Sequence, residues 1–242
     1  MALTVVYAIL FYLAAALFTI GVVRKIVIYS KTPQPLKIPT TPAPTTKAGV
    51  VWRLIKEVTV FESLFKANKW IWIFGWLFHA GLFLVLARHL RYFLEPVPTI
   101  ITAIQPFGKY AAFAMIIGLI GLWGRRFLVD RIRYISSPSD HLMLLLLLSI
   151  GISGALMTFG GTALNTDVIS VKAFIMGLIF FDLQPIPGSL LFLIHLALVA
   201  VLMIIFPVSK LLHAPGVFFS PTRNQVDDVR EHRHVAGWSA KS

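Results

Sequence analysis

Five stretches of the chain are long and apolar, and polar segments separate them. A membrane-spanning helix needs about 20 predominantly apolar residues. The stretches that meet this length are 3–28, 69–94, 107–128, 140–164 and 188–212. A sixth apolar run, 168–181, has only about 14 residues and predicts a helix at the membrane interface. The pattern therefore predicts an all-α integral membrane bundle of five transmembrane helices.

Basic residues divide unevenly between the two sides of such a bundle. Of the 22 Lys and Arg residues, 18 fall in the first loop, the third loop and the C-terminal segment, which share one side. The other side holds only Arg88, Arg91, Lys109 and Lys172. Cytoplasmic loops of membrane proteins carry the excess of Lys and Arg. We therefore expect the N-terminus outside and the C-terminus in the cytoplasm. The first stretch has no polar n-region and no A-x-A site, so we expect a retained span rather than a signal peptide.

The first cytoplasmic loop, 31–67, contains the proline-rich sequence PQPLKIPTTPAPTTK. Its prolines favour extended, unpacked backbone. Two interpretations stay open, a solvated linker and a docking strap for a cytoplasmic partner. We expect one membrane domain over 1–222, which includes this loop, and a polar cytoplasmic tail over 223–242. His232 and His234 in this tail are expected to be solvated.

The composition of the chain limits the class of protein and the cofactors and partners that it can have. Hydrophobic residues make up 57% of the chain and charged residues 13%, whereas about a quarter of the residues of a soluble domain are charged. The chain has no cysteine, which excludes disulfides, iron–sulfur clusters, thiolate metal sites and covalently attached haem. A net charge of +12 would suggest nucleic acid in a soluble protein, but here the topology accounts for it. No nucleic-acid partner is expected.

Two predicted spans carry a pair of histidines each, His79 and His89 on the second, His195 and His213 on the fifth. An ionisable side chain inside a span is costly and indicates a functional site. At ~100° per residue, a spacing of eighteen residues returns to the same helix face, and a spacing of ten leaves two residues about 80° apart. Each pair can therefore face a neighbouring helix.

The second and fifth spans run antiparallel, so His79 lies on the same side as His213, and His89 on the same side as His195. Each such pair can supply both axial ligands of one non-covalent haem b, with an inner haem iron between His79 and His213 and an outer one between His89 and His195. Ligation by two histidines leaves no open iron position and suits electron transfer. The alternative is four separate interface histidines, each hydrogen-bonded to a neighbour.

The spacings of the two pairs differ. At 1.5 Å per residue they correspond to axial separations of ~15 Å and ~27 Å. Two haems match both only if the helices tilt, the haems lean or the fifth helix is distorted. Pro207 lies between His195 and His213 and can kink that helix.

Four arginines lie near the ends of these spans and are candidates for binding haem propionates. Arg88 and Arg91 flank His89, and Arg125 and Arg126 lie at the inner end of the third span. The alternative is that all four are anchors that extend their charged ends to the interface.

Five spans with His-x9-His on the second and His-x17-His on the fifth resemble the cytochrome b (gamma) subunit family of respiratory nitrate reductase. The segment LLHAPGVFFSPTRNQ, 211–225, is also similar to the DsrM family, the transmembrane cytochrome b subunits of sulfite-reductase-linked Dsr complexes of sulfur metabolism. The resemblance implies haem ligation by His79, His89, His195 and His213. It further implies electron exchange with quinone or menaquinol near the outer haem, and a cytoplasmic iron–sulfur partner of the heterodisulfide-reductase type. Such a multi-subunit complex sits in the cytoplasmic (inner) membrane of a prokaryote.

The same resemblance bears on two cationic residues. In the nitrate reductase family a lysine beyond the outer histidine of the second span helps to form the quinol pocket, and Lys109 takes that place here, at the outer start of the third span. The alternative is that Lys109 is an interfacial anchor. The family pattern has a glycine where this chain has Arg88, so the outer haem pocket departs from the family pattern at this residue.

One further histidine, His141, follows Ser139 and Asp140 at the start of the fourth span, and these residues predict a helix N-cap rather than a haem site. We therefore expect an electron-transfer subunit of a quinol-dependent oxidoreductase complex. The gamma subunit of a nitrate reductase is the alternative within this class. A non-redox membrane anchor or a transporter is the alternative from another class, although neither inverted repeats nor a carboxylate in mid-span is found.

Overall fold

The computed structural model describes residues 1–228, which form two compact units. Unit 1 comprises Met1–Leu17 and Asn68–Ile205, and unit 2 comprises Phe18–Ala67 and the chain from Phe206 onward. Residues on both sides of the expected boundary at 222 fall in unit 2. Of the predicted polar tail, residues 229–242, with His232 and His234, lie outside the described residues.

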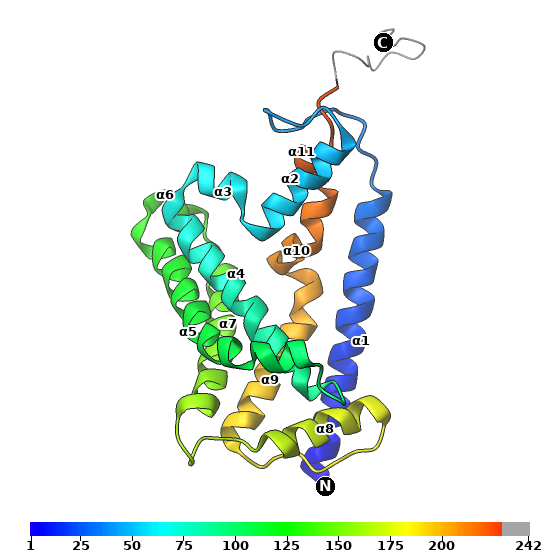
Figure 1. Ribbon diagram of the computed structural model, residues 1–242, viewed down its shortest axis with the longest axis vertical. Helices are drawn as coiled ribbons and strands as arrows, with labels where there is room; N and C mark the ends of the chain where they lie inside the picture. Colours follow the sequence, from blue (N-terminus) through cyan, green and yellow to red (C-terminus); the bar gives the residue numbers. More distant parts are fainter. Residues whose placement is uncertain (229–242) are drawn as a thin grey trace. The chain divides into compact units, whose positions relative to one another are not determined.

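Among residues 1–228, five helices are long and apolar enough to cross a membrane, which confirms the predicted number of spans (Figure 1). They are α1 (Ala2–Lys31), α4 (Lys69–His89) with the 3-10 turn η1 (Leu90–Tyr92), α5 (Thr99–Leu128), α7 (Pro138–Phe159), and α9 (Leu190–Ile205) with η2 (Phe206–Val208). The sixth apolar run forms α8 (Val168–Phe180), whose 13 residues are too few for a span. Within residues 1–228 every regular element is a helix.

Three span boundaries differ from the prediction by four residues or more, among them the end of α7, which lies at Phe159 rather than at 164. Helix α5 begins at Thr99, whereas the apolar pattern predicted a start at 107. The fifth span ends at Val208 rather than 212, and η3 (Lys210–Leu212) and α10 (His213–Gly216) follow it. The pattern missed these three ends because hydropathy does not locate the residue at which backbone hydrogen bonding starts or stops.

Polar residues just before the apolar runs begin the helices. The Asn68 side chain accepts a hydrogen bond from the Ile71 amide at the start of α4, and Asp167 accepts from the amides of Ile169 and Ser170 at the start of α8. Helix α7 begins with a capping box between Ser137 and Asp140. The cap residue is therefore Ser137 and not Ser139, because a capping box needs the acidic residue three positions after the cap.

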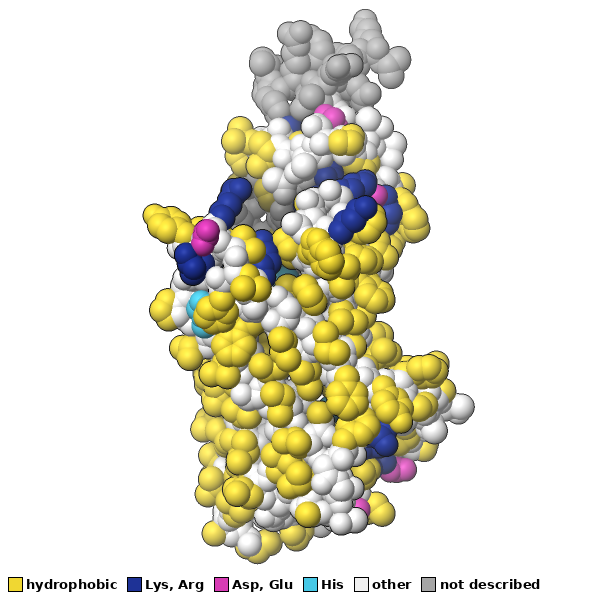
Figure 2. All heavy atoms as spheres, turned by 90° about the vertical axis from the view of Figure 1, so that its left-hand side faces the viewer, with side chains coloured by type: hydrophobic (Ala, Val, Ile, Leu, Met, Phe, Trp, Pro, Cys, Tyr) yellow, Lys and Arg dark blue, Asp and Glu magenta, His cyan; other side chains and the backbone are white. Residues whose placement is uncertain are grey.

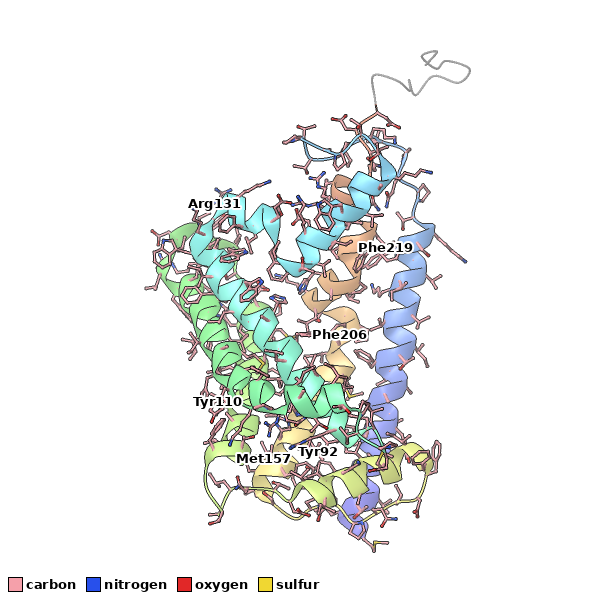
Figure 3. The ribbon with its side chains drawn as sticks, viewed as in Figure 1. Tyr92, Tyr110, Arg131, Met157, Phe206 and Phe219 are labelled. Atoms are coloured by element: carbon pink, nitrogen blue, oxygen red, sulfur yellow. The ribbon has the colours of Figure 1, made fainter. Side chains whose placement is uncertain are left out.

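Unit 1 has two hydrophobic cores. Ala8 of α1 packs with residues of α8 and α9 around Phe174, which is fully buried. Tyr92 and Met157, both labelled in Figure 3, pack against this core. The second core joins α4, α5 and α7 around Leu119. In Figure 1, α8 lies crosswise at the end of unit 1 where the chain begins, so its apolar side covers the ends of α1 and α9.

Glycines bring the backbones of α4 and α5 into direct contact. A Cβ atom placed on Gly118 would lie 2.6 Å from the Phe78 amide nitrogen, and one on Gly81 would lie 2.7 Å from that of Met115. Small residues allow this close approach between helices in a membrane.

Outward-facing side chains are large and apolar, such as Phe83 at 69% exposure, and Figure 2 shows hydrophobic side chains over most of the face that it draws. Such a surface suits contact with lipid.

Unit 2 contains the proline-rich loop, whose residues 31–46 are mostly exposed but form hydrogen bonds with a distant segment of the chain. It holds α2 (Lys47–Thr59) and α3 (Glu62–Ala67), and its extended part forms hydrogen bonds with the segment around α11 (Pro221–Asn224). The amide of Thr40 donates to the carbonyl of Thr222 over 3.0 Å, and that of Ile38 donates to the Gln225 side chain over 2.9 Å. The loop is therefore tied at these points to the segment around α11, and the linker and docking-strap interpretations both stay predictions.

Candidate functional site

His79 and His89 both bind the backbone of their own helix, α4. The Nδ1 atom of His79 lies 2.7 Å from the Gly75 carbonyl, and that of His89 lies 2.7 Å from the Val85 carbonyl. A carbonyl only accepts hydrogen bonds, so each Nδ1 carries the proton. The lone pair is then on Nε2, which is the arrangement of a histidine that binds metal through Nε2.

His195 of α9 is held by a side chain of another helix. Its Nδ1 lies 2.8 Å from the Oγ of Ser153 in α7, and this hydroxyl donates to the Ile150 carbonyl over 3.0 Å. Because the hydroxyl hydrogen is used in that bond, Nδ1–H of His195 donates to Oγ. The ring also lies against Gly154, where a Cβ atom would be 3.4 Å from Cε1.

His89 and His195 lie within unit 1, close enough for their rings to interact electrostatically. They come from α4 and α9, two helices far apart in the sequence. Both rings have Nδ1 engaged, as described above, so both have Nε2 as the metal-binding atom. This arrangement is compatible with the predicted pairing of the two residues, which stays a prediction.

His213 lies outside the fifth span. It starts α10, its side chain is exposed, and its Nδ1 lies 2.8 Å from the Lys210 carbonyl. The argument that His195 and His213 share one helix face is wrong, because α9 ends at Ile205 and the chain continues through 3-10 turns from Phe206. Proline has no N–H to continue the helix. A distorted fifth helix, one of the three conditions under which two haems match both spacings, is thus present. His79 and His213 belong to different units, and their pairing stays a prediction.

The two arginines beside His89 differ in their partners. Arg88 donates to the Gln105 carbonyl of α5 over 3.0 Å, and the Gln105 side chain donates back to the Arg88 carbonyl. Arg91 donates from Nη2 to the Tyr92 hydroxyl over 2.7 Å, and the Tyr92 ring is 5.8 Å from the His89 ring. The Nε atom of Arg91 is buried without an acceptor among residues 1–228. Arg91 therefore keeps an unsatisfied donor near His89.

The arginines at the end of α5 also differ. Arg126 donates to the Ser136 hydroxyl over 2.9 Å and lies 3.5 Å from an Asp140 carboxylate oxygen, so it fastens α5 to the start of α7. Arg125 is half-buried beside it. His141 accepts a hydrogen bond from the Trp123 indole, which gives it a structural role. Of these residues, Arg125 is the better candidate for a bound anion.

The sequence analysis placed Lys109 at the start of the third span. In the structure it lies further along the helix, because α5 begins ten residues earlier at Thr99. Its ammonium group lies 5.1 Å from the centre of the Phe159 ring and 5.9 Å from that of Tyr110, which is labelled in Figure 3. Such cation–π contacts stabilise a cation in an apolar setting. A pocket of about 420 Å³ lies between α4 and α5, with Trp76, Pro106 and Tyr110 in its lining, and Lys109 is not in that lining.

No group of three or more His, Cys, Asp or Glu side chains gathers around one point in the described part of the chain. A protein cage for a bare metal ion needs about four such ligands. Haem asks for only two axial side chains, since the porphyrin supplies the other nitrogens. The two histidines in proximity therefore suit haem better than a bare ion.

The sequence analysis missed Ser153 and Tyr92, which contact His195 and His89 respectively. Tyr92 follows His89 by three residues, a spacing at which neighbouring side chains meet on a helix. Ser153 has no comparable local signal, because its partner is 42 residues away. The span holds the hydroxyl residues Ser149, Ser153 and Thr158, and the sequence does not single out Ser153 among them.

Comparison with known proteins gives consistent matches over most of the chain. A family model described as nitrate reductase gamma subunit matches residues 46–228. The chain is 36% identical over 272 residues to the Hdr-like menaquinol oxidoreductase cytochrome b-like subunit of Archaeoglobus fulgidus, covering 94% of this chain and 81% of that protein. It is 34% identical to the subunit of the same name from Archaeoglobus profundus, covering 98% of this chain and 83% of that protein. Together with its five apolar helices, these matches show that the chain is a multi-pass membrane protein that belongs to the nitrate reductase gamma subunit family.

Proposed function

We propose that this chain is the membrane cytochrome b subunit of a quinol-dependent oxidoreductase complex. It holds two non-covalent b haems and exchanges electrons between the quinone pool and a cytoplasmic iron–sulfur partner. The observation that carries the proposal is the proximity of His89 and His195 inside an apolar bundle, each with its Nδ1 engaged. The printed names of the two Archaeoglobus relatives, cytochrome b-like subunits of a menaquinol oxidoreductase, support it.

The residues around this pair fit a haem group. His89 and His195 offer Nε2 atoms from two helices, and Gly154 leaves space beside the His195 ring. The buried Nε of Arg91 lacks an acceptor within residues 1–228, and a propionate oxygen would satisfy it. Haem supplies one-electron redox chemistry when bound, whereas the protein supplies ligands, orientation and electrostatics. In this proposal Arg91 is the principal propionate ligand, because Arg88 is already bonded to Gln105.

The remaining assignments extend the same proposal. His79 and His213 ligate the second haem, at the cytoplasmic side, and Arg125 binds its propionates, because Arg126 is already bonded to Ser136. The N-terminus is outside and the C-terminus is in the cytoplasm of a prokaryotic cell, as the distribution of Lys and Arg favours. Lys109 contributes a hydrogen-bond donor to the quinone headgroup, a role supported by its position over apolar rings in a half-buried setting.

The most specific part of the proposal is the identity of the cytoplasmic partner. The Hdr-like relatives and the DsrM-like segment 211–225 favour an iron–sulfur subunit of the heterodisulfide-reductase type, in sulfur metabolism. The family description favours a nitrate reductase instead. Purification of the intact complex separates the two, since the first predicts a cysteine-rich iron–sulfur protein and the second a molybdenum enzyme. The ligand set permits electron flow in either direction.

The experiment is a haem count on matched histidine variants. The wild-type chain, purified with saturating haem, should give a b-type α-band in its reduced-minus-oxidised spectrum and two haems per chain by pyridine haemochrome. Either His89→Ala or His195→Ala should remove one haem and leave the other. His141→Ala, which changes a histidine that bonds Trp123, is the control and should keep both. A wild-type chain without a b-type band would refute the proposal and favour a non-redox anchor or a transporter.

A further inference from the structure

Ser153 connects two helices through the ring of a proposed haem ligand. It lies in the middle of α7 with 5% of its surface exposed, and its Oγ is 2.8 Å from Nδ1 of His195 in α9. The same hydroxyl donates to the Ile150 carbonyl over 3.0 Å. Both the hydrogen and a lone pair of this hydroxyl are therefore used, and the chain of bonds runs from the imidazole N–H through Oγ–H to a backbone carbonyl.

This arrangement sets His195 apart from the other three histidines. The Nδ1 atoms of His79, His89 and His213 all lie at backbone carbonyls of nearby residues in their own segments. Those contacts depend on the local backbone and not on any side chain. The Nδ1 atom of His195 instead meets a replaceable hydroxyl on a neighbouring helix, beside the Ile150 carbonyl that the ring also reaches. A single substitution can therefore change the acceptor of this ligand without changing the ligand itself.

We propose that Ser153 is a positioning residue that fixes the ring orientation and tautomer of His195 and lowers the reduction potential of the haem that His195 ligates. The inference rests on the proposed function, because it concerns the ligand of that haem. A hydrogen bond accepted from Nδ1–H raises the electron density at Nε2 and so favours the ferric iron. The bond from Ser153 to Ile150 polarises the hydroxyl, which makes its oxygen a stronger acceptor.

The position of Ser153 is also suited to hold the ring in one rotation. Gly154, the next residue, has no side chain, and the His195 Cε1 atom lies at van der Waals distance from the position a Cβ would take. The imidazole therefore lies beside Gly154 and is bonded by Ser153 at Nδ1. These two contacts fix the direction in which Nε2 points.

The matched variants are Ser153→Ala, Ser153→Thr and Thr158→Val. The first removes the acceptor and the second keeps a hydroxyl at the same place. Thr158, one turn further along α7, donates to the Gly154 carbonyl of its own helix, so Thr158→Val removes a span hydroxyl without touching a histidine. The readouts are a redox titration of the α-band, which resolves the two haems, and the low-temperature EPR spectrum of the ferric haems, which reports the orientation of the axial rings.

Ser153→Ala should raise the potential of one haem by about 59 mV, equivalent to a tenfold change in its ratio of reduced to oxidised forms, and leave the other unchanged. The EPR signal of the same haem should shift. Ser153→Thr should restore both values, and Thr158→Val should match the wild type. Loss of one haem from Ser153→Ala, but not from Ser153→Thr, also supports the proposal.

Three results would overturn it. They are an unchanged potential and EPR signal in Ser153→Ala, an equal shift in both haems, or the same shift in Thr158→Val. Each of these leaves haem bound in the wild-type chain, so the proposed function would stand while the role of Ser153 would fall. A wild-type chain that binds no haem is a failure of the proposed function itself.

Discussion

The close contact between α4 and α5 makes Gly118 a sensitive position. A Cβ atom added by Gly118→Ala would lie 2.6 Å from the Phe78 amide nitrogen, 2.8 Å from the Phe74 carbonyl oxygen and 2.8 Å from the Phe78 Cβ. Optimal contacts between heavy atoms lie at about 3.5–4.0 Å. The atoms in the way belong mostly to the backbone of α4, so no side-chain rotation relieves the overlap and the helices must separate by about 1 Å.

Overpacking of this kind costs about 1–3 kcal/mol. For a chain of this size, each kcal/mol lowers the melting temperature by roughly 2–4 °C, so Gly118→Ala should melt about 2–12 °C below the wild type. The displaced segment of α4 carries His79, the residue after Phe78, so haem occupancy should fall as well.

The assay is thermal unfolding of the purified protein in detergent, followed by size-exclusion chromatography of the soluble fraction. Gly124→Ala is the matched control, because it lies on the same helix and a Cβ there meets nothing within 4 Å. It should be neutral or gain up to about 1 kcal/mol from the helix propensity of alanine. If Gly118→Ala melts at or above the temperature of Gly124→Ala, the inference that backbone contact holds α4 to α5 is wrong.

Two further predictions concern charged groups at the ends of helices. Asp140→Asn should destabilise the protein by about 1–2 kcal/mol, because the buried carboxylate caps α7 and pairs with Arg126. The control is Asp130→Asn, which changes an exposed ion pair. It should change the free energy of unfolding by less than about 0.5 kcal/mol. Chemical denaturation in mixed micelles compares the two, and equal effects would count against the buried pair. Hydrogen bonds from Lys56 and Lys66 lower the pKa of Glu62 to about 2. Its contribution to stability should therefore be complete above about pH 4.3 and disappear as the pH falls toward 2, and carboxyl ¹³C NMR should show Glu62 still ionised at pH 3.5.

Local features of the sequence determined the membrane architecture. Apolar runs of sufficient length predicted all five spans, and the short run at 168–181 predicted a helix too short to cross, which is α8. The absence of cysteine and the presence of histidines in the spans limited the possible cofactors. These inferences succeed because the free-energy cost of placing backbone and charged groups in lipid is set by the individual residues of each run.

Helix ends and loop packing were less predictable. The pattern carried the fifth span through Pro207 to residue 212, although the helix ends at Ile205. Prolines in the first loop indicated unpacked backbone, whereas Thr40 and Ile38 bond the distant segment 222–225. The helix ends before Pro207 because proline has no N–H to donate, and in the first loop the backbone is held by hydrogen bonds to residues 222–225. Hydropathy records neither feature.

Only the tertiary structure decided which of the candidate residues meet. It brings His89 near His195, binds His195 to Ser153, pairs Arg88 with Gln105 and leaves the Nε of Arg91 without an acceptor within residues 1–228. All of these facts depend on how helices distant in the sequence pack together. A hydrogen bond between partners on separate helices depends on distance and angle in space, and the residue types along each helix specify neither.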